Sequence, residues 1–379
     1  MSLDAVYTRD HYLDWQRPRT VWLSTSKPVF FVLGNGIVWV IVTVIVLVAV
    51  VYVLIDRSLS APRHHGPTSD HFDGTRFHNL DPHDKKGFVD LLRWQLTSKR
   101  GAWNRWTESE SSPLPPTRIM GNELRVTFIN HATVLIQTGG LNILTDPIWS
   151  ERASPFTWAG PKRHRAPGIS LEDLPPIDVV LISHNHYDHL DMQTLAKLHA
   201  RYQPRFVTGL GNSALLTAGG INQVVELDWW QVTKISDALS VTCVPAKHFS
   251  GRGLSDGDGT LWCGYVMQTP AGNIYFAGDT GMGTHFAEIK QRFQTFRLAL
   301  LPIGAYLPRW FMHPVHISPS EAVELHCRLQ PRVSMAIHFG TFALGDDGEL
   351  EPVLQLREAS NNDSNIWVLE HGEGRDVPS

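Results

Sequence analysis

The strongest constraint on this chain is an uninterrupted apolar run near its N-terminus. Residues 29–55 carry no charged side chain and read VFFVLGNGIVWVIVTVIVLVAVVYVLI. As an α-helix this run would extend about 40 Å, which exceeds the ~30 Å hydrocarbon core of a bilayer. The run is longer than the apolar core of a secretory signal, and Asp56-Arg57 follow it instead of a small-residue cleavage site. It predicts one transmembrane helix at 29–55, preceded by an N-terminal tail at 1–28.

Basic residues flank the run on both sides. Those before it are Arg9, Arg17, Arg19 and Lys27, and those after it are Arg57, Arg63 and Arg76. Under the positive-inside rule, the small excess before the run favours a cytoplasmic N-terminus with the remaining chain on the other side. So small a difference leaves the membrane face of the catalytic domain open.

Composition limits the functions open to the chain beyond the membrane segment. The net charge of −4 gives the chain no overall positive field, so nucleic acid is not an expected partner. Cys243, Cys263 and Cys327 form no close pair, which excludes a cysteine-based zinc site and argues against a disulfide framework. The 19 histidines direct the search for metal ligands, because histidine is the commonest protein metal ligand.

Residues 56–118 read as a neck between the membrane helix and the main domain. Apolar residues recur at helical spacing over Gly87–Leu96, and SSPLPP at 111–116 is typical of a linker. The neck is expected to pack on the main domain or on the membrane surface. Four of its histidines lack ligand spacing and are expected to be solvated: His64, His65, His71 and His78.

From about residue 119 short apolar runs alternate with helical patterns. Strands are predicted at 124–129, 134–138, 142–144, 179–182, 205–208, 232–235, 239–244, 261–268, 273–277, 298–302, 334–337 and 366–369. Helices are predicted at 191–201, 213–218, 285–293 and 319–329, the last with Ser318 as its cap. The early strands read as hairpins, and helices separate the later ones. This order predicts an α/β fold, a four-layer αββα sandwich over residues 119–379.

One cluster carries most of the chemistry. An apolar strand ends at Ile182, and His184-Asn185-His186-Tyr187-Asp188-His189 follow almost directly. In an extended segment His184 and His186 face the same way and can hold one ion, while Asp188 and His189 project from the turn toward a second position. Imidazole and carboxylate suit Zn²⁺, and so dense a set of ligand types is highly specific.

Four later residues are candidates to complete the site. His248, Asp279 and His338 each follow a predicted strand, and the carboxyl ends of strands are where open α/β sheets build their sites. His316 lies between a strand and the helix at 319–329, and it is expected to be a functional residue that is not a ligand.

The order of these groups is similar to that of a known enzyme family. HxHxDH followed by a separate His, Asp and His resembles the metallo-β-lactamase superfamily. Over roughly residues 119–345 the chain resembles, more narrowly, the N-acylphosphatidylethanolamine-hydrolysing phospholipase D family. The blocks that carry this resemblance, in family order, are TDPI at 145–148, RASP at 152–155, GPKR at 160–163, LPPID at 174–178, ELDWW at 226–230, FAGDTG at 276–281, PIGAY at 302–306, PRWFM at 308–312 and MAIHFGTF at 335–342.

The resemblance implies the metallo-β-lactamase fold and two zinc ions per chain. One ion would be held by His184, His186 and His248. The other would be held by Asp188, His189 and His338. Asp279 would bridge the two ions, and His316, together with Asp188, would act on the substrate. The clear transmembrane span departs from the family, whose animal members bind membranes peripherally.

Several neighbouring residues have simpler interpretations. Asp146 is expected to accept hydrogen bonds in a turn or behind the ligands more than to bind metal. Asp191 is expected to cap the following helix, with support of a metal histidine as the alternative. His131 is expected to be a structural histidine at the border of the pocket. Trp229-Trp230 and Trp310-Phe311 are expected to pack in the core or an interface, with a lipid-facing role open for the second pair.

The implied reaction is zinc-dependent hydrolysis of phospholipids similar to N-acylphosphatidylethanolamine, giving phosphatidic acid and an N-acylethanolamine through a hydroxide shared by the metals. The alternative is another two-zinc hydrolase of the same fold, a lactonase or a phosphodiesterase of soluble substrates, because this scaffold carries many reactions. A non-enzymatic protein that binds metal or organises the cell envelope is a third hypothesis, and the complete ligand set argues against it. The expected partners are a phospholipid substrate and the membrane, and a homo-oligomer is left open.

Overall fold

The computed structural model describes residues 29–81, 86–108 and 112–379, with side chains from residue 38 onward. The predicted tail at 1–28, with the four cations that precede the apolar run, lies outside the described residues. The chain divides into two compact units, residues 1–54 and residues 55–379.

The apolar run forms helix α1 (Val29–Leu59). Within it, Val38–Leu59 is long enough to cross a membrane, and its most apolar 18-residue stretch has a mean hydropathy of 3.2 and none of it is buried. Signal sequences can share this length and composition. Helix α1 is therefore described as a candidate membrane span.

Two seven-stranded sheets form the centre of the second unit. The first sheet runs in the order β14 (Gly374–Asp376), β1 (Leu124–Asn130), β2 (Thr133–Thr138), β3 (Leu141–Thr145), β4 (Val179–Ile182), β5 (Arg205–Gly209) and β6 (Val224–Leu227). The second runs β13 (Ile366–Trp367), β12 (Pro331–Ile337), β11 (Phe296–Pro302), β10 (Gly272–Phe276), β9 (Gly264–Thr269), β8 (Leu239–Val244) and β7 (Val232–Ser236). In each sheet a stretch of antiparallel pairs joins a stretch of parallel pairs.

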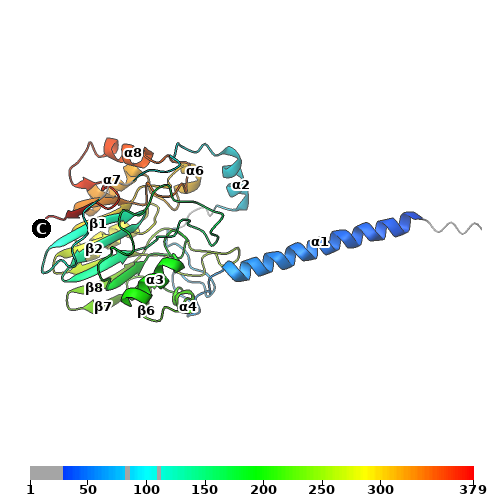
Figure 1. Ribbon diagram of the computed structural model, residues 1–379, viewed down its shortest axis with the longest axis horizontal. Helices are drawn as coiled ribbons and strands as arrows, with labels where there is room; N and C mark the ends of the chain where they lie inside the picture. Colours follow the sequence, from blue (N-terminus) through cyan, green and yellow to red (C-terminus); the bar gives the residue numbers. More distant parts are fainter. Residues whose placement is uncertain (1–28, 82–85, 109–111) are drawn as a thin grey trace, which may run out of the picture. The chain divides into compact units, whose positions relative to one another are not determined.

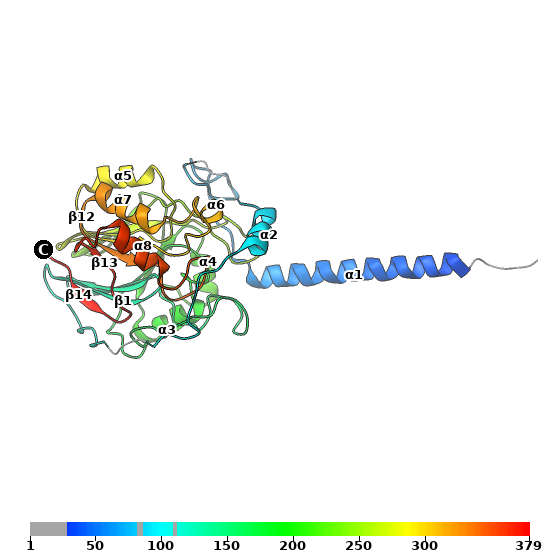
Figure 2. The ribbon, with the colours of Figure 1, turned by 90° about the horizontal axis from the view of Figure 1, so that it is seen from above.

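Helices cover the outer faces of the two sheets. On the first sheet, α3 (Met192–Tyr202) and α4 (Ser213–Ala218) share a buried cluster with β4 and β5. Beside the second sheet lie α5 (His285–Phe293), α7 (Pro319–Leu329) and α8 (Glu351–Ala359), whose apolar side chains join the main core. Figure 2 shows α5 and α7 on one side of the sheets and α3 on the other. The predicted four-layer αββα sandwich is confirmed.

Strand ends and helix starts follow from local sequence. All four residues of β4 are buried, as expected for a strand covered on both faces. Asp191 caps α3 by accepting from the Gln193 N–H, as predicted. Ser318 and Glu321 form the predicted capping box of α7. The sequence patterns did not reveal β6, β14, α8 or the short α6 (Arg309–Met312).

Much of the predicted neck is part of the domain. Phe72 and Phe77 are buried in the main core, and α2 (Phe88–Thr97) is tied to the 346–349 loop by the Trp94 indole N–H, which donates to Asp346 at 2.9 Å. The expectation that His71 is solvated was wrong. Its imidazole is buried, lies 2.7 Å from Asp228 and stacks on Trp229 with ring centroids 4.3 Å apart.

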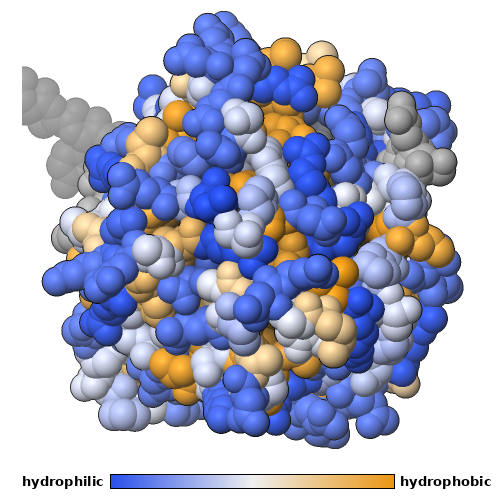
Figure 3. Space-filling view, turned by 90° about the vertical axis from the view of Figure 1, so that its left-hand side faces the viewer, coloured by the Kyte–Doolittle hydropathy of each residue, from blue (hydrophilic) through white to orange (hydrophobic). Residues whose placement is uncertain are grey.

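The molecular face that carries the C-terminus has the surface of an ordinary water-soluble domain. Hydrophilic residues predominate there, and apolar residues appear as small separate patches (Figure 3). A surface of mixed polar and scattered apolar residues is normal for a globular domain.

Candidate metal centre

Residues 184–189, named here the metal turn, follow β4 directly and bring several ligand types together. His184 Nε2 lies 2.8 Å from His186 Nδ1, and His248 Nε2, just after β8, lies 3.3 Å from the same atom. Ligands 2.0–2.1 Å from one tetrahedral zinc ion are about 3.3 Å apart. These three imidazoles therefore form a group that could hold one ion.

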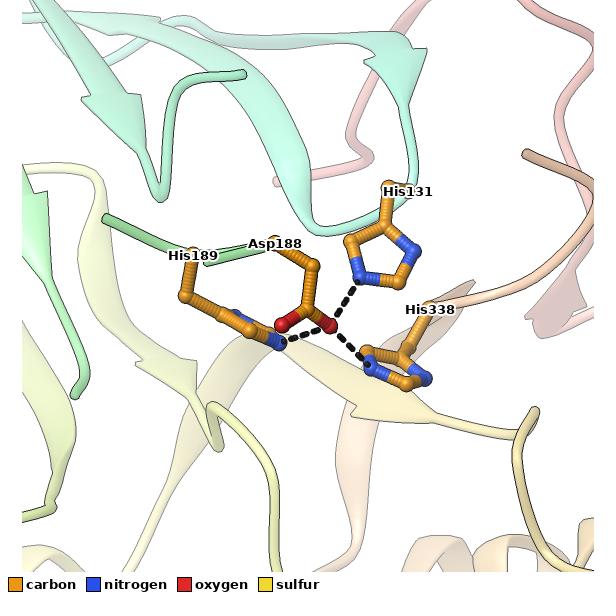
Figure 4. A group of neighbouring side chains, drawn as sticks. All are labelled: His131, Asp188, His189 and His338. Atoms are coloured by element: carbon orange, nitrogen blue, oxygen red, sulfur yellow. Dashed lines mark hydrogen bonds and ion pairs between the residues drawn. The ribbon is translucent and has the colours of Figure 1, made fainter. Parts of the chain in front are cut away.

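A second group forms around the carboxylate of Asp188. Its Oδ2 atom lies 3.2 Å from His189 Nε2 and 3.5 Å from His338 Nε2. His131 Nε2 is 3.0 Å from the same oxygen. Figure 4 shows the three imidazoles pointing at this one carboxylate oxygen from three separate segments of the chain. The group has the composition of a second metal site.

Asp279 lies between the two groups. Its Oδ2 is 3.0 Å from His338 Nε2, 3.2 Å from His189 Nε2 and 3.9 Å from His248 Nε2. The chain reaches this position through Gly278, whose φ is +61°. A Cβ at Gly278 would lie 2.8 Å from the Cβ of Ser183, so a larger residue would displace the strand end that leads into the metal turn.

His316 completes the cluster from the loop before α7. Its Nδ1 is 3.9 Å from Asp279 Oδ2, and its ring centroid is 5.1 Å from that of His248. The backbone N–H of His316 donates to Met312 at 2.9 Å, and Arg309 donates to its carbonyl at 3.1 Å. The structure thus brings together all eight residues that the sequence singled out, which are His184, His186, Asp188, His189, His248, Asp279, His316 and His338.

Burial and charge divide the histidines of the cluster into two kinds. Burial lowers the pKa of His184 and His248 well below the ordinary value and that of His186 to about 4, which favours the neutral imidazole that binds metals. Burial also opposes charge on His338, but the carboxylates of Asp279 and Asp188 outweigh it and raise its pKa to about 9. The carboxylates of Asp188 and Asp279 therefore stabilise positive charge near His338.

Several polar atoms at the centre have no hydrogen-bond partner among the described residues. They are His316 Nδ1, His338 Nδ1 and Asp279 Oδ1, while His189 Nε2 and His338 Nε2 face carboxylate oxygens without a well-directed hydrogen bond. An unsatisfied buried polar atom costs about 1–3 kcal/mol, so a cluster of them is unfavourable unless a ligand satisfies them. A cation bound by their lone pairs would remove this cost for the ligand atoms. The residues present fit divalent metal ions.

In three of the cluster histidines, the ring nitrogen Nδ1 contacts an oxygen atom of the protein. Asp146 Oδ2 accepts from His189 Nδ1 at 2.6 Å, and the Val315 carbonyl accepts from His248 Nδ1 at 3.0 Å. Ser183 Oγ lies 2.9 Å from His184 Nδ1. Such partners orient a ligand ring and leave its other nitrogen for the metal. Asp146 also accepts from the N–H and hydroxyl of Ser183, in agreement with the predicted role of hydrogen-bond acceptor.

Two residues at the centre were not recognised from the sequence. His131 was expected to be structural at the pocket border, yet its ring directly contacts Asp188. Asn79 of the neck donates its amide N–H to the His248 carbonyl at 2.8 Å and accepts from the His248 N–H at 3.1 Å. The dipeptide Asn130-His131 after a predicted strand was a signal for the first, whereas no pattern in the neck points to Asn79.

A sandwich of two mixed sheets with a histidine–aspartate cluster at the strand ends defines a metal-dependent hydrolase scaffold, and the class is confirmed by comparison with known proteins. A family model, the Beta-lactamase superfamily domain, matches residues 141–339. Isothiocyanate hydrolase from Delia radicum gut bacteria shares the fold at 23% identity and a TM-score of 0.53, covering 66% of this chain and 98% of that one. Igni18, a metallo hydrolase from Ignicoccus hospitalis, gives 21% identity and 0.52, covering 68% and 99%.

Two curated relatives place the chain more closely. N-acyl-phosphatidylethanolamine-hydrolyzing phospholipase D 1 of Caenorhabditis elegans is 41% identical over 266 residues, which are 66% of this chain and 75% of the relative. The mitochondrial enzyme of the same name from Saccharomyces cerevisiae is 39% identical over 224 residues, 57% of this chain and 47% of that protein. The chain belongs to the beta-lactamase superfamily and, within it, to the N-acylphosphatidylethanolamine-hydrolysing phospholipase D family. It is a metal-dependent hydrolase.

Proposed function

We propose that this protein is a two-zinc phospholipase D that cleaves N-acylphosphatidylethanolamine-like lipids to phosphatidic acid and an N-acylethanolamine. The observation that carries the proposal is a largely apolar cavity of about 550 Å³ that reaches the cluster. His248 and His316 line its inner end, and Phe88, Trp94 and Phe311 line its walls. An apolar cavity with a few polar groups at one end suits an amphiphile whose phosphate meets the metals.

The wall formed by α2 favours a lipid over a soluble substrate. Leu91 and Trp94 of this helix face the cavity, and the Trp94 ring stacks on Phe311 at 4.9 Å. On the same helix Val89 and Leu96 expose 77% and 86% of their surface. A short helix that is apolar toward the cavity and also toward solvent is typical of an element that lies in a membrane interface.

The proposed ligand assignment follows the two groups. His184, His186 and His248 would hold one zinc ion, Asp188, His189 and His338 would hold the other, and Asp279 lies where its carboxylate could serve both groups. Bound zinc ions lower the pKa of a water molecule and withdraw charge from phosphoryl oxygens. The protein supplies the dry walls of the cavity and the fixed carboxylates. His316 directs Nδ1 toward Asp279, where a donated N–H can orient a phosphoryl oxygen or protonate the leaving alcohol.

A membrane location follows from the same proposal. Helix α1 is a candidate span, and an anchor would hold the catalytic unit at a high local concentration of lipid headgroups. We propose a single-pass arrangement in which residues 1–28 are a tail and 29–55 span the bilayer, while the predicted neck at 56–118 packs with the catalytic domain at 119–379 and supplies α2 to its cavity.

The proposal is tested with the purified full chain in mixed micelles. With zinc present, the wild type should release phosphatidic acid from N-acylphosphatidylethanolamine, and His186→Ala should reduce the rate at least about a hundredfold because one ligand is lost. His65→Ala, which alters an exposed histidine of the neck, serves as the control and should keep full activity. Release of a different phosphate-containing product, or turnover of soluble esters and lactones alone, would overturn the proposal in favour of another hydrolase of this fold.

A second variant separates binding of metal from action on the substrate. His316→Ala should keep two zinc ions per chain while kcat falls about 10²–10⁴-fold, the usual range for loss of a general acid or base. Full turnover with both ions bound would remove His316 from the mechanism. Zinc content is measured on the same samples.

A further inference from the structure

The loop at residues 250–259 contacts the metal turn chiefly through the side chain of Arg252. Arg252 Nη1 donates to two backbone carbonyls, that of Asn185 at 2.8 Å and that of Leu190 at 2.9 Å. Its guanidinium carbon lies 3.9 Å from the ring centroid of Tyr187. The neighbouring Gly251 N–H donates to Asn185 Oδ1 at 2.8 Å. Because the two carbonyls stand on either side of three proposed ligands, Arg252 restricts the conformation of the segment that carries them.

The loop owes its shape to Asp256. This buried carboxylate accepts from the backbone N–H of Gly253 at 2.8 Å and from that of Arg252 at 3.1 Å. It also accepts from the N–H of Ala61 at 2.8 Å, which belongs to the segment after α1. One carboxylate therefore closes the loop on itself and attaches it to the chain that leaves the apolar helix.

A second carboxylate strengthens that attachment. Asp56, in the last turn of α1, accepts from the N–H groups of Leu254 at 2.8 Å and Ser255 at 2.9 Å, and from the Ser255 hydroxyl at 2.5 Å. The Ser60 hydroxyl donates to Asp56 at 2.6 Å, and Arg63 donates to the Ser255 carbonyl. Charge-assisted hydrogen bonds of this kind are about twice as strong as neutral ones.

We propose that Arg252 is a positioning residue of the metal centre, and that Asp256 and Asp56 position Arg252 in turn. The residues that directly follow the apolar run are then a structural part of the centre. This inference rests on the proposed metal-dependent function, but it concerns the order of the metal turn and not the identity of the substrate.

The first test replaces Arg252 in the full chain. Arg252→Gln should weaken zinc binding about tenfold or more, the usual effect of removing an outer partner of a metal site. Amide hydrogen exchange of residues 184–191 should become faster. The zinc affinity and exchange rate of Arg252→Lys should lie between those of the wild type and Arg252→Gln. An ammonium group can donate to a carbonyl, but it has no planar face to stack on the Tyr187 ring. Zinc affinity is measured by competition with a chelating dye.

The chain provides a closely matched control for this substitution. Arg201 also donates to two backbone carbonyls, those of Leu171 at 3.1 Å and Glu172 at 2.8 Å, and its guanidinium lies 5.0 Å from the Tyr202 ring. These contacts are remote from the metal turn. Arg201→Gln should therefore leave zinc affinity and the exchange of residues 184–191 unchanged.

The second test addresses the attachment to the helix. Asp56→Asn should speed hydrogen exchange in residues 250–259 and 184–191 and weaken zinc binding a few-fold, while the unfolding temperature changes little because the residue is on the surface. Asp363→Asn is the control, since Asp363 accepts from the N–H of Asn365 in an exposed turn that precedes β13 at the edge of the second sheet.

Each outcome counts for or against the inference. If folded Arg252→Gln binds zinc within twofold of the wild type and exchange in residues 184–191 is unchanged, Arg252 does not position the centre. If Asp56→Asn changes neither zinc affinity nor exchange while Arg252→Gln changes both, Asp56 does not position Arg252. A wild type that binds zinc without cleaving the lipid would overturn the proposed function alone, because affinity and exchange do not depend on the substrate.

Discussion

At the scale of single residues, the orientation of the ligand rings depends on hydrogen bonds made by their other nitrogen. His189 and His248 each give Nδ1 to a protein oxygen and turn Nε2 toward the cluster. A ring fixed in this way has one tautomer and one direction, which lowers the entropy lost when a metal binds.

Gly278 sets the position of Asp279, and its replacement should be costly. Gly278→Ala is expected to lower the free energy of unfolding by about 2 kcal/mol or more, because the left-handed backbone and the contact with Ser183 are both unfavourable for a Cβ. Chemical denaturation followed by tryptophan fluorescence measures the change. Gly121→Ala is the matched control, since Gly121 has φ +62° with nothing within 4 Å of a Cβ, and it should show the smaller backbone cost alone.

The buried His71 should make stability depend on pH. Burial opposes its charge, but Asp228 and Asp70 outweigh burial and raise its pKa above 6.5. The pKa of Asp228 is lowered: burial opposes its charge too, but the hydrogen bond from His71 outweighs burial, so the carboxylate stays ionised over the relevant range. A raised histidine pKa adds stability that is complete below pH 6.5 and is lost as pH rises through the folded-state pKa.

The stability difference between wild type and His71→Asn should therefore be larger at pH 6 than at pH 9. Unfolding midpoints in urea at the two pH values measure it, and His65→Asn serves as the exposed control. A difference that stays constant with pH, or that grows toward pH 9, would contradict the assigned ion pair.

At the scale of elements, the strongest local patterns were predicted correctly from sequence. The bounds of β4, β8, α4, α5 and α7 agree with the structure, because apolar periodicity, caps and flanking turn residues all act locally. The short parallel edge strand β6 was missed, since its pairing with β5 is a contact that its own four residues do not encode. Helix α8 was also missed, although it buries as many of its nine residues as α5 does, three in each.

Helix α2 should matter for lipid on a membrane more than for dispersed lipid. The double change Val89→Asp and Leu96→Asp is expected to reduce turnover of lipid in vesicles at least about threefold, because two apolar side chains that would enter the bilayer interface, each worth about 1.5–3 kcal/mol when fully buried, are lost. Turnover of a short-chain substrate below its micelle concentration should be unaffected.

The control for α2 is an exposed leucine elsewhere on the surface. Leu354 on α8 exposes 60% of its surface, and α8 is separate from α2 in both ribbon views (Figures 1 and 2). Leu354→Asp should leave both activities unchanged. The membrane role of α2 would be wrong if Leu354→Asp reduced turnover as much as the α2 double variant does. It would also be wrong if the α2 variant lost equal turnover on vesicle lipid and on the dispersed substrate.

At the scale of the whole molecule, the cluster joins the two sheets. The metal turn follows β4 of the first sheet, whereas His248, Asp279 and His338 follow β8, β10 and β12 of the second. Ions held by both sides would cross-link the sandwich in the folded state only, and binding to the folded state alone stabilises it.

Removal of metal should therefore lower the unfolding temperature. Exhaustive chelation is expected to reduce Tm by several degrees, with recovery when zinc is added back, because a ligand in hundredfold excess over its Kd contributes about 2.7 kcal/mol. His338→Ala should lose most of this response. A wild type whose Tm is insensitive to chelation, while zinc analysis shows that the metal has left, would contradict the cross-link.

The sequence by itself determined the apolar helix, the layered α/β class and the identity of the densest ligand cluster, because each depends on periodicity or on spacing within a few residues. Family resemblance then indicated which distant residues complete the set. Only the tertiary structure decided that His131 contacts Asp188, that Asn79 holds His248 and that Arg252 contacts the metal turn. These contacts link residues up to about 170 positions apart, and such pairings are set by the packing of the sheets and not by any local pattern.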